Sequence, residues 1–496
     1  MTAIRLARRT LLFGGASLMV APWLRPLSAA EVELPPDAVR FRPEIEPLVR
    51  LLETTPRERL FPVIAETIRN GTPYVPLLAA TLLAGIRNVQ PRPDVGFKFH
   101  CVMVVHAAHQ ATLAARDEHR WLPLFWSMDY FKRCQEQDRN EGDWTMRDPT
   151  RAALGGERAM VELREAMERW DVERADAAIP AAVAEIPSSR LLEFFARFGS
   201  RDFRNIGHKA IWVAGAFRTL EAIGWEHAEP VMRSLAYAAL NHSGQPNPAD
   251  ADLEADRAGR NNVARAERSI SDRPQRDDDG WVAEWMAGAR TESPEGLAEL
   301  TANGLRDGIA PATAFDAIRL AAAELVTRQP AIVPLHAMTS THALHYLHRS
   351  VADERLRRWL LLQNASFVAH FRQAAAGRGT LPETDLLAMT ADEEKMTEPG
   401  EILERLGSDG TAASRAALGY LESGGDASRL LAHARDQILL KGNDSHDYKY
   451  GEALFEEATL AAPSRRARLI AGGLRLLTPT SAPDNGLAAR IAEAFG

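Results

Sequence analysis

The sequence predicts an all-α protein in which helical hairpins stack as a solenoid or a closed α-α array around a cavity. Ala, Leu, Arg and Glu dominate the 496 residues, and the alternating β-branched residues typical of strands are scarce. Many segments carry helix ends, with Ser or Thr before Pro at the start and Gly after the last turn. A capped helix followed by a longer apolar helix recurs three times, which indicates repeated hairpins that leave a groove or cavity.

The first thirty residues have the anatomy of an export signal. Arg8 and Arg9 precede an apolar stretch, residues 11–24, that is too short to span a bilayer, and small residues at 27–30 suit a signal peptidase. The adjacent arginines, followed by Thr-Leu-Leu, favour the twin-arginine route over the alternatives of a Sec signal or an uncleaved anchor. That route carries folded cargo, often with a cofactor inserted. We expect residues 1–30 to be a twin-arginine signal peptide and the mature protein to be periplasmic, with the twin-arginine export machinery as a partner.

The composition limits the partners of the mature chain. The net charge is −8, and residues 1–30 hold four arginines and no acid, so the mature chain is more acidic still. An acidic chain is a poor match for nucleic acid, and no later apolar run is long enough to cross a membrane. The two cysteines, Cys101 and Cys134, are candidates for a disulfide in an oxidising compartment, although their spacing does not decide the question.

The helical elements follow in order along the chain. The hairpin units are expected at residues 55–88, 188–223 and 293–326. Within and between them, individual helices are predicted from Thr55-Pro56 to Gly71, from Pro230 in a first turn to Leu240, and from Ser293-Pro294 to Gly308.

A polar segment at residues 243–280 divides the chain. Leu253, Val263 and Ile270 are almost its only large apolar residues, which predicts a long loop, a lid or a partly disordered insertion. We therefore expect a helical N-terminal lobe over residues 31–242 and a helical C-terminal lobe over residues 281–496.

Several common enzyme classes lack their sequence signatures here. The chain has no GxGxxG after a strand and no P-loop, so neither standard phosphate cradle is visible. The motifs GxSxG and HExxH are absent, and no Glu stands three residues before a His, as it does in di-iron bundles. The CxxCH motif that attaches c-type haem is absent as well.

Clustered histidines are the remaining candidates for chemistry. They lie in otherwise apolar helical stretches, where an imidazole must find a partner and where several together ligate a metal or move protons. The alternative for each residue is a core histidine bonded to a backbone carbonyl. The metal-ligand candidates are His100, His106, His109, His342 and His345. The catalytic candidates are His208, His336, His446 and Lys449, of which the last two share a helix face at a spacing of three residues.

Four segments resemble the questin oxidase-like family. IVPLHAMTSTHALHYL is similar to that family's helix with a His-Ala-x-Thr core followed by Ala-Leu, and NDSHDYKYGEALFEEA is similar to its His-x-x-Lys-x-x-Glu-Ala helix. GHKAIWVAGAFRTL and FHCVMVVHAAHQATL look like its helices with an early His. The order of the segments matches the family, and the resemblance spans roughly residues 45–480.

The resemblance implies an oxidoreductase that inserts oxygen beside a ketone of an aromatic, anthraquinone-like ring, with NADPH as the reductant. Because free NADPH is a cytoplasmic reagent, an exported member would need a bound transition metal (iron, copper or zinc), a tightly held cofactor or another electron source. The substrate would be a small apolar or aromatic molecule.

Two functional hypotheses follow. In the first, an exported oxidoreductase binds its substrate in a helical cavity lined by His100, His106, His208 and His336, and His446 with Lys449 polarises a carbonyl. In the second, the chain is a periplasmic helical-repeat binding or scaffold protein without catalysis, and its histidines lie scattered on different faces. The position of His446 and three of the cavity histidines, His100, His208 and His336, relative to one shared cavity separates the two. A metal-dependent hydrolase is a third, weaker option.

Overall fold

The structure, a computed structural model, describes residues 34–35, 37–91, 95–240, 244–392 and 398–496. It is 73% helical, with 23 α-helices and no β-strand among the residues described, so the all-α prediction is confirmed. Stacking of the hairpins as a solenoid or closed array stays a prediction. The proposed signal peptide, residues 1–30, lies outside the described residues.

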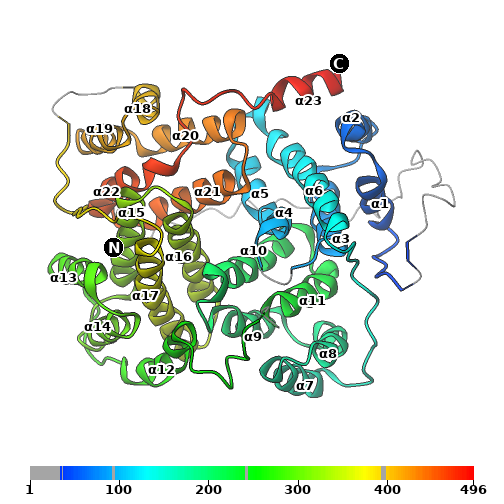
Figure 1. Cartoon of the computed structure of the whole chain (residues 1–496), viewed down its shortest axis with the longest axis horizontal. Coiled ribbons are helices and arrows are strands. Elements are labelled where there is room, and N and C mark those ends of the chain that lie inside the picture. Colours follow the sequence, from blue (N-terminus) through cyan, green and yellow to red (C-terminus); the bar gives the residue numbers. More distant parts are fainter. Residues whose placement is uncertain (1–33, 36, 92–94, 241–243, 393–397) are drawn as a thin grey trace, which may run out of the picture.

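The helices before the polar segment follow one another in sequence, with a long connection, residues 141–155, between α6 and α7 (Figure 1). They are α1 (Glu46–Thr54), α2 (Leu60–Arg69), α3 (Tyr74–Asn88), α4 (His100–Met103), α5 (Val105–Ala114), α6 (Leu122–Asn140), α7 (Gly156–Arg169), α8 (Val172–Glu185), α9 (Ser188–Ser200), α10 (His208–Ile223) and α11 (Ala228–Ala239).

The remaining helices run from the polar segment to the C-terminus. They are α12 (Glu254–Arg268), α13 (Asp279–Thr291), α14 (Pro294–Arg306), α15 (Pro311–Arg328), α16 (Ile332–Ser350), α17 (Glu354–Ala376), α18 (Pro399–Leu406), α19 (Gly410–Glu422), α20 (Ala427–Lys441), α21 (Ser445–Leu460), α22 (Pro463–Gly473) and α23 (Leu487–Phe495). The last helix packs against α2, so the C-terminal helix lies beside one of the first helices of the chain.

Two of the three predicted helices begin where expected, whereas the one predicted from Thr55-Pro56 is a 3₁₀ turn, Arg57–Arg59, followed by α2 from Leu60. Ser293 caps α14 by accepting a hydrogen bond from the Gly296 backbone N–H, and Pro294 occupies the first turn. Pro230 lies in the first turn of α11, which ends at Ala239 with Leu240 as its C-cap. Helix α10 is apolar around most of its circumference, and almost every residue of α10 is buried, as expected for a helix surrounded by protein.

The segment 243–280 differs from the expected loop or lid because it contains helix α12. The buried residues of this helix are small or polar, Ala258, Gly259, Asn262 and Ala266 among them, so a search for large apolar side chains misses its packed face. A Cβ at Gly259 would collide with the backbone of Arg201, so this face sits tightly on its neighbours. The helix packs on α14 and α17.

A central bundle of four helical segments positions the candidate site. The segments are α4 with α5, α10, α16 and α21; helix α5 contacts α10 and α21, and α16 contacts the same two helices. These helices appear near the middle of the view in Figure 1. They come from well-separated parts of the sequence: α4, α5 and α10 precede the polar segment 243–280, and α16 and α21 follow it. Contacts in the bundle therefore join helices from both sides of this segment.

Among the described residues, no helix is both long and apolar enough to serve as a membrane span.

Candidate metal centre

Each segment of the central bundle contributes one histidine from near its N-terminal end. His100 and His208 are the first residues of α4 and α10, His446 is the second residue of α21, and His336 lies in the second turn of α16. Side chains of a helix lean toward its N-terminus, so all four imidazoles project toward the same end of the bundle.

The four rings meet in one buried cluster, called here the four-histidine cluster. The Nε2 atom of His208 lies 3.1 Å from Nε2 of His100 and 2.7 Å from Nε2 of His336. The ring of His446 packs against the ring of His100 with centroids 4.5 Å apart. One ligand atom from each of the four rings lies within 4.8 Å of the others, close enough for all four to bind one metal ion.

Partners outside the cluster hold the other ring nitrogens. His336 Nδ1 lies 2.7 Å from the carbonyl oxygen of Ile332, and His446 Nδ1 lies 2.5 Å from Oδ1 of Asp444. His208 bonds to the backbone of Val95, and His100 Nδ1 lies 3.2 Å from Oγ of Ser445. Such outer partners orient the rings and set which nitrogen carries the proton.

The position of the proton on each imidazole ring explains why the cluster suits a cation. Carbonyl and carboxylate oxygens only accept hydrogen bonds, so Nδ1 of His336 and of His446 must donate. In a neutral ring the other nitrogen, Nε2, then carries a lone pair. Nε2 of His446 is buried without a hydrogen-bond partner among the described residues. Lone pairs that converge at these distances repel one another unless a cation lies between them.

The pKa shifts of the four rings agree with neutral imidazoles. Burial is the largest cause, and the charge of Lys449 the second, of a pKa well below the usual value for His100 and for His336. The pKa of His208 is also lowered well below the usual value, first by burial and then by the charge of His336. Burial and Lys449 also lower the pKa of His446. The four rings are therefore neutral near pH 7, which is the form that binds metal.

The donor set fits a first-row transition metal. Neutral imidazole nitrogens suit zinc, copper, iron and nickel, whereas magnesium and calcium prefer oxygen donors. Among the described residues, these four histidines form the one group of three or more His, Cys, Asp or Glu side chains placed to hold a metal ion. The expectation of a transition-metal site is therefore supported, without the identity of the metal.

A cavity of about 1000 Å³ opens beside the four-histidine cluster. All four histidines line it, and its wall also contains Phe97, Ile206 and the arginines Arg133 and Arg378. Phe97 is 77% exposed although it is a large apolar residue. The cavity wall thus combines the histidines with apolar and basic side chains, and with acidic ones such as Glu136 and Glu141.

Strained backbone lies shortly before two of the helices that carry the four-histidine cluster. Phe97 has φ 46°, and Asn205 and Ile206 have φ 57° and 44°, which non-glycine residues rarely adopt. Gly96, at φ 152°, packs on the cluster: a Cβ there would lie 3.1 Å from two atoms of the His208 ring. Such strain persists where surrounding structure enforces it and is common at functional sites.

The structure separates the remaining predicted ligands from the cluster. His106 and His109 lie on α5, where His109 Nδ1 is 3.1 Å from the hydroxyl of Tyr74. His342 and His345 bond to Glu457, with Nδ1 atoms 3.1 and 2.9 Å from its carboxylate. None of these four histidines belongs to the group placed to hold a metal, whereas His100 does.

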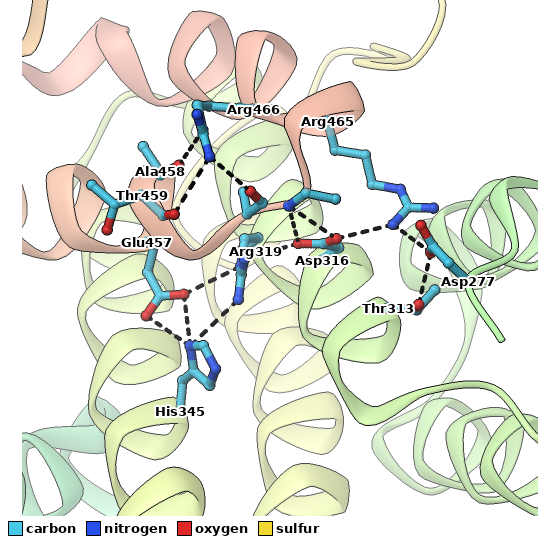
Figure 2. A network of polar contacts seen from close by, with 12 residues as sticks. Asp277, Thr313, Asp316, Arg319, His345, Glu457, Ala458, Thr459, Arg465 and Arg466 are labelled. Carbon is cyan, nitrogen blue, oxygen red and sulfur yellow. Dashed lines mark hydrogen bonds and ion pairs between the residues drawn. The ribbon is translucent and has the colours of Figure 1, made fainter. Parts of the chain in front are cut away.

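Glu457 also anchors a buried network of ion pairs, shown in Figure 2. Its carboxylate lies 3.2 Å from Nε of Arg319, which donates to Asp316, and Arg465 reaches Asp316 and Asp277 from α22. This network joins α15, α16, α21 and α22, so the carboxylate that binds His342 and His345 also holds helices together.

Lys449, a predicted catalytic residue, lies one turn below His446 on α21. Burial lowers its pKa to about 7, and its Nζ has no hydrogen-bond partner among the described residues. Its charge contributes to the lowered pKa of each cluster histidine.

Sequence reasoning missed the outer partners of the cluster. Asp444 is the N-cap of α21 and Ser445 follows it, so an acid two residues before a helical His was the available signal. The backbone partners, Val95 and Ile332, carry no side-chain signal. The cysteines Cys101 and Cys134 are both buried and free, so the pairing considered above is not formed.

Comparison with known proteins adds no assignment. No protein-family model matches the chain, and neither a curated protein nor a solved structure matches it.

Replacing Asp444 by Asn tests the role of this outer partner. Asn still caps the helix but no longer fixes the His446 proton with a charged acceptor, so we expect metal affinity to fall by about 10- to 100-fold. A competition titration against a chelating dye measures the affinity. Asp484→Asn, at an exposed carboxylate that bonds only to the Gly486 backbone, is the matched control. Equal affinities in the two variants would contradict the assignment.

Proposed function

We propose that this protein is an exported, metal-dependent oxidoreductase that inserts oxygen into an aromatic or ketone-bearing small molecule. The observation that carries the proposal is the convergence of four neutral imidazoles at the wall of a large cavity. A bound iron or copper ion would supply the redox chemistry, and the four histidines would hold it.

The resemblance to questin oxidase-like proteins supports the choice of reaction. The four segments that carry the resemblance are the segments that contribute His100, His208, His336 and His446. An arrangement of this kind is the outcome that the oxidoreductase hypothesis predicted, whereas the scaffold alternative predicted histidines on scattered faces.

The electrostatics of the bundle favour negative charge at the centre. Helices α10 and α21 direct their N-terminal ends toward the cluster, and a helix N-terminus carries a partial positive charge. An enolate-like or reduced-oxygen ligand would be stabilised there. Arg378 adds a positive charge near His336.

The cavity wall suits an apolar substrate. Phe97 and Ile206 present apolar surface close to the four-histidine cluster, and burial of that surface against an aromatic ring is favourable. Ile332, at the start of α16, adds to the same wall. These side chains would orient the substrate and exclude water from the reacting face.

Export is part of the proposal and rests on residues 1–30. The electron source follows from it: NADPH is what the resemblance implies, and a periplasmic enzyme would draw electrons from its substrate or another donor. Cell fractionation and a comparison of turnover with and without NADPH separate these alternatives.

The test combines metal analysis with oxygen uptake. Purified protein is stripped with a chelator and reloaded separately with iron, copper and zinc, and oxygen consumption is followed with hydroxyanthraquinones and simpler aryl ketones. We expect one metal ion per chain and substrate-dependent oxygen uptake with iron or copper but not zinc. Protein that binds none of these metals would refute the proposal, and ester hydrolysis by the zinc form without oxygen uptake would favour the hydrolase.

A further inference from the structure

A second, smaller cavity lies inside the central bundle, below the four-histidine cluster. Its volume is about 50 Å³, and it is called here the inner compartment. Every residue that lines it follows one of the four cluster histidines by three, six, seven or ten positions. The four segments therefore run in the same direction and in register, and the inner compartment lies on the axis of the bundle.

The register divides the axis into layers. The first layer is formed by the residues three positions after the histidines, Met103, Ile211, Thr339 and Lys449. The next layer contains residues six positions after them, among them His106, His342 and Glu452. Arg218 and Glu456 occupy the layer ten residues below. Ten residues of helix rise about 15 Å, which is the distance from the histidines to this last layer.

Two buried polar groups in the inner compartment lack partners among the described residues. Both ring nitrogens of His106 and Nζ of Lys449 make no hydrogen bond. His106 is 9% exposed and Lys449 is 6% exposed, and both side chains line the compartment. A neutral imidazole has one donor and one acceptor, and leaving both unsatisfied in the interior is costly.

The far layer connects the inner compartment to the surface. Arg218 donates to Nε2 of His342 and to the carboxylate of Glu456, over 2.9 and 2.6 Å. The Glu456 side chain is 29% exposed, so it reaches solvent. Glu452, which also lines the compartment, accepts a hydrogen bond from Nε of Arg435 over 2.9 Å.

We propose that the inner compartment binds ordered water, and that this water with His106 and Glu456 forms a proton path between solvent and the four-histidine cluster. The volume holds one or two water molecules, since each occupies about 30 Å³ in the liquid. A buried water needs two to four polar partners, and His106, Lys449, Thr339 and Gln110 surround the space. The proton path rests on the proposed function; the water site does not.

Reduction of oxygen consumes protons, which a buried centre must draw from solvent. Along this axis a proton passes from Glu456 through water to one nitrogen of His106, while the other nitrogen releases a proton toward the cluster. No covalent bond between heavy atoms changes in this transfer.

The water site is tested first, without reference to turnover. A high-resolution crystal structure of the metal-loaded protein is expected to show water within hydrogen-bond distance of His106, and ¹⁵N-histidine NMR in D₂O is expected to show fast exchange of its ring proton. His370, whose Nε2 is also buried without a partner but which lines none of the cavities described, supplies the comparison. A dry compartment, or ring exchange as slow as that of His370, would overturn the proposal.

The proton path is tested with His106→Phe, which keeps a ring of similar size and removes both nitrogens. We expect unchanged metal stoichiometry, oxygen uptake lowered by about 100-fold as for a lost proton-transfer group, and a larger solvent isotope effect. His370→Phe should leave all three unchanged. Should His106→Phe fail to fold, Glu456→Gln replaces it as the test. Glu456 lies at the partly exposed end of the proton path, and its replacement should also lower oxygen uptake and raise the solvent isotope effect. Normal turnover and isotope effect in the metal-loaded variant would overturn the path.

Should the protein bind metal but consume no oxygen, the proposed function fails and the hydration measurements still decide the water site. The two proposals therefore fail in distinguishable ways.

Discussion

Replacing His208 by Ala is expected to weaken metal binding strongly, because three imidazoles remain where the wild type has four. Nε2 of this residue lies between Nε2 of His100 and of His336, at 3.1 and 2.7 Å, so its loss removes the central donor of the set. At a free metal concentration about 1,000 times the Kd, binding stabilises the folded protein by about 4 kcal/mol. The wild-type protein should gain this stability on addition of metal, and the variant should gain much less at the same metal concentration. Metal analysis and thermal unfolding with and without metal measure both effects.

His109→Ala is the matched control for this experiment. His109 is also a helical histidine whose pKa is lowered by burial, but it bonds to Tyr74 and lies outside the four-histidine cluster. Its loss should leave the metal-dependent stabilisation intact. A His208→Ala protein that binds metal as tightly as the wild type would refute the assignment of the cluster.

Replacing Glu457 by Gln is expected to cost about 3–5 kcal/mol of folding free energy, the usual result of breaking a buried ion pair. The carboxylate faces Arg319, His342 and His345, and the Arg319 side chain is only 2% exposed. An amide cannot balance the guanidinium, which would keep Asp316 as its one buried carboxylate partner among the described residues, and Asp316 is shared with Arg465. Urea unfolding of the metal-free proteins isolates this effect from the metal site.

The same variant should change the dependence of stability on pH. Burial opposes ionisation of Glu457, but the charges of His345 and Arg319 outweigh it and hold its pKa well below the usual value. Its contribution is therefore present above the unfolded pKa, about 4.3, and is lost as pH falls below that value toward the folded pKa. Wild-type stability should fall over this acidic range, and Glu457→Gln should show a shallower fall. Exposed Glu66→Gln is the control, and equal slopes for Glu457→Gln and the wild type would contradict the assignment.

The helical fold was predictable because its signals are local. Caps such as Ser293 and first-turn prolines such as Pro294 and Pro230 act within one turn, so the sequence near each helix end suffices to place it. Helix α12 escaped the prediction because small residues such as Ala258 and Gly259 pack it, and small residues give little hydrophobic periodicity.

The candidate site was predictable only in part because its contacts are long-range. His100, His106 and His109 share one helical stretch, and nothing local distinguishes the ring that meets His208, 108 residues away. The His342–His345 spacing is equally typical of a ligand pair, but Glu457, more than a hundred residues later, binds both rings. A repeated spacing was nevertheless present: each cluster histidine is followed, six or seven residues later, by a residue that lines the inner compartment.

The wide separation of the four ligands has a consequence for the order of events during synthesis. His446 leaves the ribosome 346 residues after His100, a delay of roughly 17 to 70 seconds at about 5–20 residues per second. Throughout that delay the nascent chain holds an incomplete set of imidazoles, which a metal can bind only weakly. Under the proposed function, metal capture would therefore belong to the last stage of biogenesis, after α21 has docked, and an export route that accepts folded proteins would be compatible with loading in the cytoplasm.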